Sequence, residues 1–172
     1  MPSIITFGEM LIDFVPTTNG VSLSNATTFI KAAGGAPANV AVGLARLGLS
    51  CGFMGQVGND AFGHFLAHTL QENNVDTTEL KFSPRARTAL AFVSLKADGE
   101  RDFMFYRHPS ADMLYSPDQV GVTLATGQKT NVRICSPILS CSSLIIPPLA
   151  AQVTSINRVP IVQPVAPAQA NR

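Results

Sequence analysis

The run Gly-Gly-Ala-Pro-Ala-Asn at residues 34–39 has the clearest capacity for ligand chemistry in this chain. Gly34 and Gly35 carry no side chain, so their backbone can approach a ligand closely. Pro37 suits the first turn of a helix, whose N-terminal amides have no partner within the helix, and Asn39 can both donate and accept hydrogen bonds. The run predicts a cradle for a small polar ligand. A glycine turn before a helix is the alternative, since the run matches neither the dinucleotide fingerprint nor a P-loop.

Asp13 is a second candidate for ligand contact. The apolar stretch Ser3–Val15 is interpreted as one buried strand, with Asp13 near its end. In open α/β sheets, ligands bind beyond the carboxyl ends of the strands, and one carboxylate can accept hydrogen bonds from two sugar hydroxyls. A turn-capping role for Asp13 before Pro16 stays open, because aspartate also favours turns.

His64 and His68 are spaced i, i+4, as metal-ligating histidines on a helix can be. No third ligand is visible in the sequence, and both fall opposite the apolar face of the helix that we expect there. We interpret them as solvent-facing and predict no metal site.

The elements that would position these residues alternate between strand and helix. Helices are predicted over Pro37–Leu47 and Ala61–Asn73, the second capped by Asp60, with a strand over Cys51–Val57 between them. This order favours a parallel α/β sheet. The predicted inner helix faces are Ala38, Ala41, Val42 and Ala45, then Phe62, Phe65, Leu66 and Thr69.

A hairpin then interrupts the alternation. Strand-like runs at Thr88–Lys96 and Arg101–Arg107 flank Asp98-Gly99, which is a strong turn signal. Both pleat faces read as apolar, so the hairpin needs a cover on each side. We expect a ligand on one side and a partner subunit on the other, with a packed helix as the alternative. The expected faces are Leu90, Phe92, Phe103 and Phe105 against Ala89, Ala91, Val93, Leu95, Met104 and Tyr106.

The composition excludes several classes of protein. A net charge of +1 with 13% charged residues gives no basic patch for nucleic acid or a membrane surface. Three cysteines, Cys51, Cys135 and Cys141, show neither a disulfide framework nor a metal pattern. No transmembrane run and no targeting leader is recognised, so we expect a cytoplasmic protein.

Several motifs together resemble the ribokinase (PfkB) carbohydrate kinase family. The glycine run at 34–39 continues to Ala41, Gly48 and Gly58 as in the family's amino-terminal signature. Further agreement lies in Gly-Glu-x-Leu-Ile-Asp at 8–13 and Gly-Gln-Val-Gly-Asn-Asp-x-Phe-Gly at 55–63. The residues at 34–41, together with Phe-Tyr-Arg at 105–107, are most similar to those of plant-type fructokinases.

The resemblance implies a ribokinase-like three-layer α/β fold with a small antiparallel lid, at about 86–108, and ATP-dependent phosphorylation of a sugar, most simply fructose. ATP and Mg²⁺ are the implied cofactors. Asp13, Gly34, Gly35 and Asn39 match sugar-binding positions. Phe105 would wall the pocket, and Arg107 would lean over it from a lid that also makes a homodimer or heterodimer contact. From the residues alone, a solvated surface ion pair is an equal alternative for Arg107.

The composition changes near residue 119. All 11 acidic residues precede residue 119, whereas 120–172 has no aromatic residue and holds half of the 12 prolines. We therefore predict a sugar-kinase portion at 1–119 and an unrelated, disordered, Pro-rich tail at 120–172, read as a retained intron, a shifted frame or an isoform tail. The family's Gly-Ala-Gly-Asp motif, with its catalytic aspartate, is absent. No catalytic residue is therefore assigned, and this chain is expected to be inactive because the fold stops after roughly its first half.

Two other functions stay open. The amino-terminal signature is shared by other sugar and nucleoside kinases of the family. The second is not enzymatic: the chain would be a regulatory protein that pairs with an intact kinase through the lid.

Overall fold

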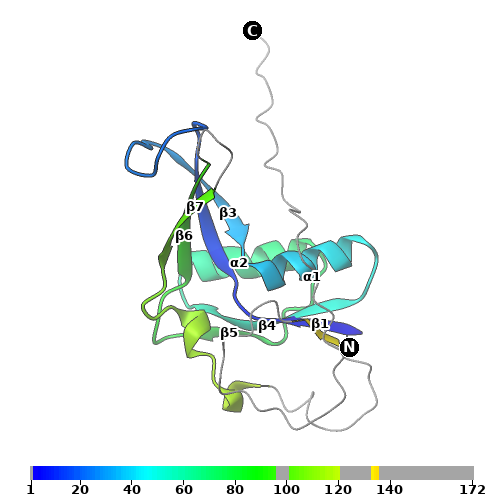
Figure 1. Cartoon of the computed structure of the whole chain (residues 1–172). Coiled ribbons are helices and arrows are strands. Elements are labelled where there is room, and N and C mark those ends of the chain that lie inside the picture. Colours follow the sequence, from blue (N-terminus) through cyan, green and yellow to red (C-terminus); the bar gives the residue numbers. More distant parts are fainter. Residues whose placement is uncertain (1, 96–100, 121–132, 136–172) are drawn as a thin grey trace.

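The computed structural model describes residues 2–95, 101–120 and 133–135 and contains two sheets. The first has the strand order β5-β4-β1-β8, and its neighbours β1–β4, β1–β8 and β4–β5 all pair in parallel. Its strands are β1 (Ile4–Phe7), β4 (Cys51–Gly58), β5 (Leu80–Ser83) and β8 (Arg133–Cys135). Both helices cover one face of this sheet (Figure 1), as expected for a parallel α/β layer.

The two helices form where the apolar spacing predicts them. Helix α1 (Ala36–Arg46) begins with proline in its first turn and buries Ala38 and Ala41, whose small side chains allow close packing on the sheet. Helix α2 (Ala61–Glu72) is capped by Asp60, whose carboxylate accepts from the amides of Phe62 and Gly63. The inner face of α2 centres on Gly63, Leu66, Ala67 and Leu70, while Phe62 and Phe65 are partly buried against the same core.

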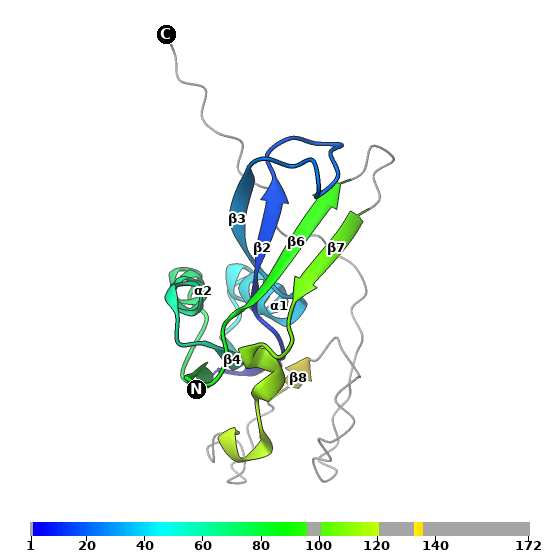
Figure 2. The ribbon, with the colours of Figure 1, turned by 90° about the vertical axis from the view of Figure 1, so that its left-hand side faces the viewer.

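The second sheet, which we call the lid sheet, has the order β3-β2-β6-β7 and rises away from the first (Figure 2). Its strands are β2 (Leu11–Pro16), β3 (Phe29–Gly34), β6 (Ala89–Leu95) and β7 (Arg101–Tyr106). Strands β6 and β7 pair antiparallel, which confirms the expected hairpin. The expected Asp98-Gly99 turn lies outside the described residues.

The prediction of one strand over Ser3–Val15 is wrong. Gly8, with φ of 147°, separates β1 from β2, and the two strands belong to different sheets. A side chain at Gly8 would lie 2.6 Å from the Pro37 ring, so the sharp bend also needs the space that glycine leaves. Asp13 consequently sits inside β2 of the lid sheet, not at the end of a parallel strand.

The predicted assignment of the hairpin faces is also wrong. Leu90 pairs with Tyr106, and Ala91 with Phe105, so Phe105 shares a face with Ala91 and not with Leu90. The error comes from the unknown length of the loop, because the number of loop residues fixes which strand positions lie opposite each other.

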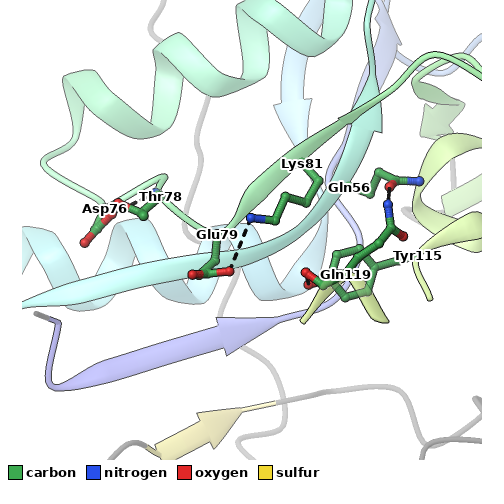
Figure 3. Close-up of polar contacts among 7 residues, drawn as sticks. All are labelled: Gln56, Asp76, Thr78, Glu79, Lys81, Tyr115 and Gln119. Atoms are coloured by element: carbon green, nitrogen blue, oxygen red, sulfur yellow. Dashed lines mark hydrogen bonds and ion pairs between the residues drawn. The ribbon is translucent and has the colours of Figure 1, made fainter. Parts of the chain in front are cut away.

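The segment after the lid is tied back to the first sheet. It holds two short 3₁₀ helices, η1 (Ala111–Leu114) and η2 (Pro117–Gln119). Gln56 in β4 donates to the Ala111 carbonyl at 2.7 Å and accepts from the Gln119 side-chain amide at 2.7 Å. Figure 3 shows the Gln56–Gln119 pair beside Tyr115. Tyr115 packs its ring on Phe7, and burial, followed by the nearby Glu79 carboxylate, raises the pKa of its hydroxyl.

Strand β8 belongs to the segment that we expect to be an unrelated tail. Its three residues pair in parallel with β1, and the remainder of 121–172 lies outside the described residues. The division at 119/120 therefore stays a prediction. No helix in the described part of the chain is long and apolar enough to cross a membrane.

Candidate functional site

A row of four residues crosses the lid sheet on one face. Asp13 in β2 lies opposite Ala32 in β3 and Ala91 in β6, and Ala91 lies opposite Phe105 in β7. Residues directly opposite each other in a sheet project to the same side, so a carboxylate and an aromatic ring share one face with only alanines between and beside them. An aromatic surface with one well-placed polar group is typical of a small-molecule site.

Gly34 and Gly35 join this row to the start of α1. A side chain at Gly34 would overlap the carboxylate of Asp13, so only glycine leaves that carboxylate in place. At Gly35, with φ of 105°, a side chain would lie 2.5 Å from the Glu9 carbonyl oxygen. The paired glycines therefore allow the Asp13 carboxylate and the Glu9 backbone to approach the N-terminus of α1.

Asn39 lies in the first turns of α1 and is half-buried. Its backbone amide donates to the Gly35 carbonyl at 2.9 Å, so the helical hydrogen bonding begins at the glycine pair. Asn39 thus follows the cradle by one turn of helix, as the sequence predicts.

Arg107 lies just beyond the end of β7 and is held by an ion pair. Its guanidinium donates to Asp112, whose side chain is only 4% exposed, and Ser110 donates to the other oxygen of the same carboxylate. The Nε atom of Arg107 is buried without a hydrogen-bond partner among the described residues. Arg107 therefore forms an ion pair, as the alternative interpretation of the sequence expected, but this pair is largely buried.

Glu9 is a titratable residue of this region that the sequence reasoning missed. Burial is the largest effect on the Glu9 carboxyl and raises its pKa above the ordinary value, and the Asp112 charge adds to the rise. Hydrogen bonds from the backbone of Glu9 and Ala36 and the positive charge of Arg107 lower the pKa and only partly offset burial. Glu9 therefore links the start of α1 to Arg107. The position of Glu9 in the Gly-Glu-x-Leu-Ile-Asp motif could have identified it as a candidate residue. No sequence pattern could have identified Asp112, because its contact with Arg107 depends on the path of the chain after β7.

The structure places four of the six predicted residues in two groups. Asp13 and Phe105 belong to the row on the lid sheet, where Gly34 borders Asp13, while Arg107 belongs with Glu9 near the start of α1. The other two, Gly35 and Asn39, lie at the N-terminus and in the first turns of α1.

His64 and His68 face solvent and contact neighbouring side chains of α2 and β5 and of the turn before α2. Both are exposed; His64 bonds with Asn59 at 3.0 Å and stacks on Phe82, while His68 lies 3.3 Å from Glu72. Within the described ranges, no group of three or more His, Cys, Asp or Glu side chains could hold a metal ion.

Comparison with known proteins extends over most of the chain. The sequence profile described as pfkB family carbohydrate kinase matches residues 1–169. A probable fructokinase-2 from Arabidopsis thaliana is 57% identical over 126 residues, covering 73% of this chain and 38% of that protein. A fructokinase from Solanum tuberosum is 58% identical over 126 residues, covering 73% of this chain and 40% of that protein. The chain thus spans about two fifths of the length of these relatives.

Solved structures show the same fold. A fructokinase from Xylella fastidiosa superposes with a TM-score of 0.66 at 40% identity, over 80% of this chain and 42% of that one. A sugar kinase from Pyrococcus horikoshii in complex with ATP gives a TM-score of 0.68 at 34% identity, over 76% of this chain and 42% of that one. The ribokinase-like fold expected from the sequence is therefore confirmed.

Proposed function

Because this chain belongs to the pfkB family of carbohydrate kinases, we propose that it carries the sugar-binding part of a fructokinase. The row Asp13–Ala91–Phe105 is the observation that supports this most directly. In this proposal, Asp13 accepts hydrogen bonds from adjacent sugar hydroxyls, Phe105 covers the apolar side of the ring, and Gly34 keeps the carboxylate in position. Asn39 and Arg107 donate to further sugar oxygens.

The proposed reaction is transfer of the γ-phosphoryl group of ATP to a hydroxyl of fructose, giving fructose 6-phosphate. Positioning and charge stabilisation dominate phosphoryl transfer. The described residues offer positioning groups for the sugar but no cluster that would hold Mg²⁺, so we assign neither a metal ligand nor a catalytic base. We therefore propose that this chain on its own binds sugar without phosphorylating it.

Two measurements test the proposal. Titration of the 172-residue chain with fructose, followed by calorimetry or NMR, should show saturable binding that is lost in Asp13→Ala. ATP-dependent phosphorylation should be absent from the chain alone and present in a version that carries the carboxyl-terminal half of a family member. Turnover by the chain alone would overturn the inactivity, and failure of both forms to bind fructose would overturn the sugar site. Ribose, ketodeoxygluconate and adenosine, tested in the same way, separate fructokinase from other kinases of the family.

A second candidate function is that of a subunit that pairs with an intact kinase or a second copy through the lid. Strand β7 favours it because four consecutive apolar side chains, Phe103 to Tyr106, are 43–57% exposed. Such a run on an edge strand is typical of an interaction surface. Sedimentation velocity of the chain, alone and mixed with a full-length relative, measures this pairing. Met104→Glu should weaken it, and a monomer under all these conditions would refute it.

We also propose that the protein is located in the cytoplasm.

A further inference from the structure

A cavity of about 290 Å³ lies at the carboxyl ends of β4 and β5, apart from the proposed sugar site. It is lined by Asn59, which follows β4, and by the segment that runs from Ser83, the last residue of β5, to Arg87. It includes none of the six residues predicted for the sugar. In the strand order it lies at the β5 edge, opposite the edge formed by β8.

The walls of this cavity are fixed by hydrogen bonds. The Asn59 amide donates to the Ser83 carbonyl at 2.8 Å, and the Arg85 amide donates to the Ser83 hydroxyl at 3.2 Å. At the other end of the segment, the Arg87 carbonyl accepts from the Ala111 amide at 2.9 Å. The segment is therefore attached at both ends before any ligand arrives, which lowers the cost of ordering it on binding.

The side-chain oxygens at and next to the cavity already have partners. Asp60, which is not among the lining residues, accepts from Thr88 and from the first turn of α2, so both of its carboxylate oxygens have partners. The Asn59 side-chain oxygen pairs with His64, and the Ser83 hydroxyl oxygen already accepts from Arg85. Among the side chains that line the cavity, the polar groups left to meet a ligand are thus mainly donors.

Two of these donors carry full positive charge. The side chains of Arg85 and Arg87 are exposed, and no hydrogen bond or ion pair joins either guanidinium to another group in the described part of the chain. The Ser83 hydroxyl and the side-chain amide nitrogen of Asn59 add neutral donors, and no carboxylate lines the cavity. A planar guanidinium matches the oxygens of phosphate in a bidentate way.

We propose that this cavity is a second ligand site, separate from the sugar site, that binds a phosphate group through Arg85 and Arg87. The same chemistry suits inorganic phosphate and the phosphoryl group of a sugar phosphate. A sugar phosphate is favoured over the free ion only if the sugar ring makes further contacts with the walls.

The test is a titration of the 172-residue chain with inorganic phosphate, followed by NMR of the arginine Nε–H groups and the Ser83–Arg87 amides. We expect saturable shifts at these positions that decrease as sodium chloride is added. The double variant R85Q/R87Q should weaken binding by more than about tenfold, since it removes two charge-assisted contacts. The matched control R46Q/K81Q removes the same charge outside the cavity and should leave the affinity within about twofold.

Either of two results would overturn the site. One is the absence of saturable shifts at Ser83–Arg87, and the other is equal weakening by the two double variants, which would mean a general charge effect. Fructose 6-phosphate, titrated into Asp13→Ala and followed at the Ser83–Arg87 amides, distinguishes the sources: tighter binding than phosphate assigns the site to a sugar phosphate, and equal binding assigns it to the phosphate group alone. Because Asp13→Ala removes the proposed sugar contact, these readouts do not depend on fructose binding at Asp13, and the site can fail or stand separately from the proposed function.

Discussion

At the scale of single residues, the proposed site depends on two glycines, which leave space by having no side chain, as much as on its polar and aromatic residues. Gly34 permits the Asp13 carboxylate to occupy the space beside β3, and Gly35 permits the Glu9 backbone to reach α1. The sequence singles out Asp13 and Gly34 as candidate ligand residues, but it does not show that the position of one depends on the other. This dependence follows from the pairing of β2 with β3, which no local pattern reveals.

Gly34→Ala should lower the affinity for fructose by about tenfold or more, because the added methyl group displaces the Asp13 carboxylate. The same overlap should change the free energy of unfolding much less, because the atoms that the methyl group meets belong to the Asp13 and Leu11 side chains, which can rotate away. Calorimetric titration and denaturant unfolding measure the two effects. Gly20→Ala is the control: it adds a methyl group in open space at a φ of 75°, so it should cost some stability without changing sugar affinity.

Asp60 should make the protein less stable in acid. Burial opposes its ionisation, but hydrogen bonds from Thr88, Gly63 and Phe62 outweigh burial and hold its pKa below the ordinary value of 3.8. Its stabilising contribution is therefore complete above 3.8 and is lost as pH falls through the lower pKa of the folded state. Asp60→Ala should cost about 1–2 kcal/mol at neutral pH. Urea unfolding from pH 7 to pH 3 should show a smaller acid loss in Asp60→Asn than in the parent, and an unchanged loss would contradict the assignment.

Glu9 should have the opposite effect on stability. Its pKa lies above the ordinary value of 4.5, mainly because of burial, so ionisation is harder in the folded than in the unfolded chain. Stability should fall as pH rises from 4.5 through the raised pKa and stay constant above it. Glu9→Gln cannot ionise, so its stability relative to the parent should increase across this pH range. A pH-independent difference between the two unfolding curves would show that Glu9 titrates normally.

At the scale of elements, helices were easier to predict than strand register. The residues of α1 and α2 have apolar spacing and local caps, so neighbours in the sequence decide where the helices form. The split of Ser3–Val15 into β1 and β2 depends on Gly8 packing on Pro37, a contact across many residues. The faces of the hairpin depend on its loop length. These features require the tertiary structure, because strand pairing is non-local.

The observed register predicts different effects for two adjacent residues of β7. Phe105 shares the face of Asp13, whereas Met104, opposite Phe92, lies on the other face. Phe105→Ala should therefore weaken fructose binding by about tenfold. Met104→Ala is the matched control, with similar exposure, and should leave the affinity within about twofold. Calorimetric titration compares the two, and a larger loss in Met104→Ala would place the sugar on the opposite face of the lid sheet.

At the scale of the whole molecule, the described sheets have open edges. Strands β3 and β7 end the lid sheet, and β7 combines an edge position with exposed aromatic side chains. Since the chain spans about two fifths of its relatives' length, the surfaces that cover such edges in a whole kinase are not expected to be complete here.

We therefore expect the 172-residue chain, when produced alone, to self-associate reversibly at high concentration and to melt over a broader temperature range than an extended version. Addition of the carboxyl-terminal half of a relative should give a cooperative thermal transition. Size-exclusion chromatography with light scattering, together with calorimetric melting, tests this. A soluble monomer with one sharp transition in the short chain would contradict the expectation.

The attachments at the two ends of the lid hairpin bear on how this hairpin can be exchanged between relatives. Before β6, Thr88 is held by Asp60, and after β7, Ala111 is held by Gln56 and by the Arg87 carbonyl. Residues 89–106 therefore lie between two fixed points on the same part of the molecule. A chimaera that takes only this block from a relative keeps both attachments and exchanges Phe105, whereas the other five residues of the proposed sugar site stay in the scaffold, so it isolates what the hairpin strands add to sugar affinity.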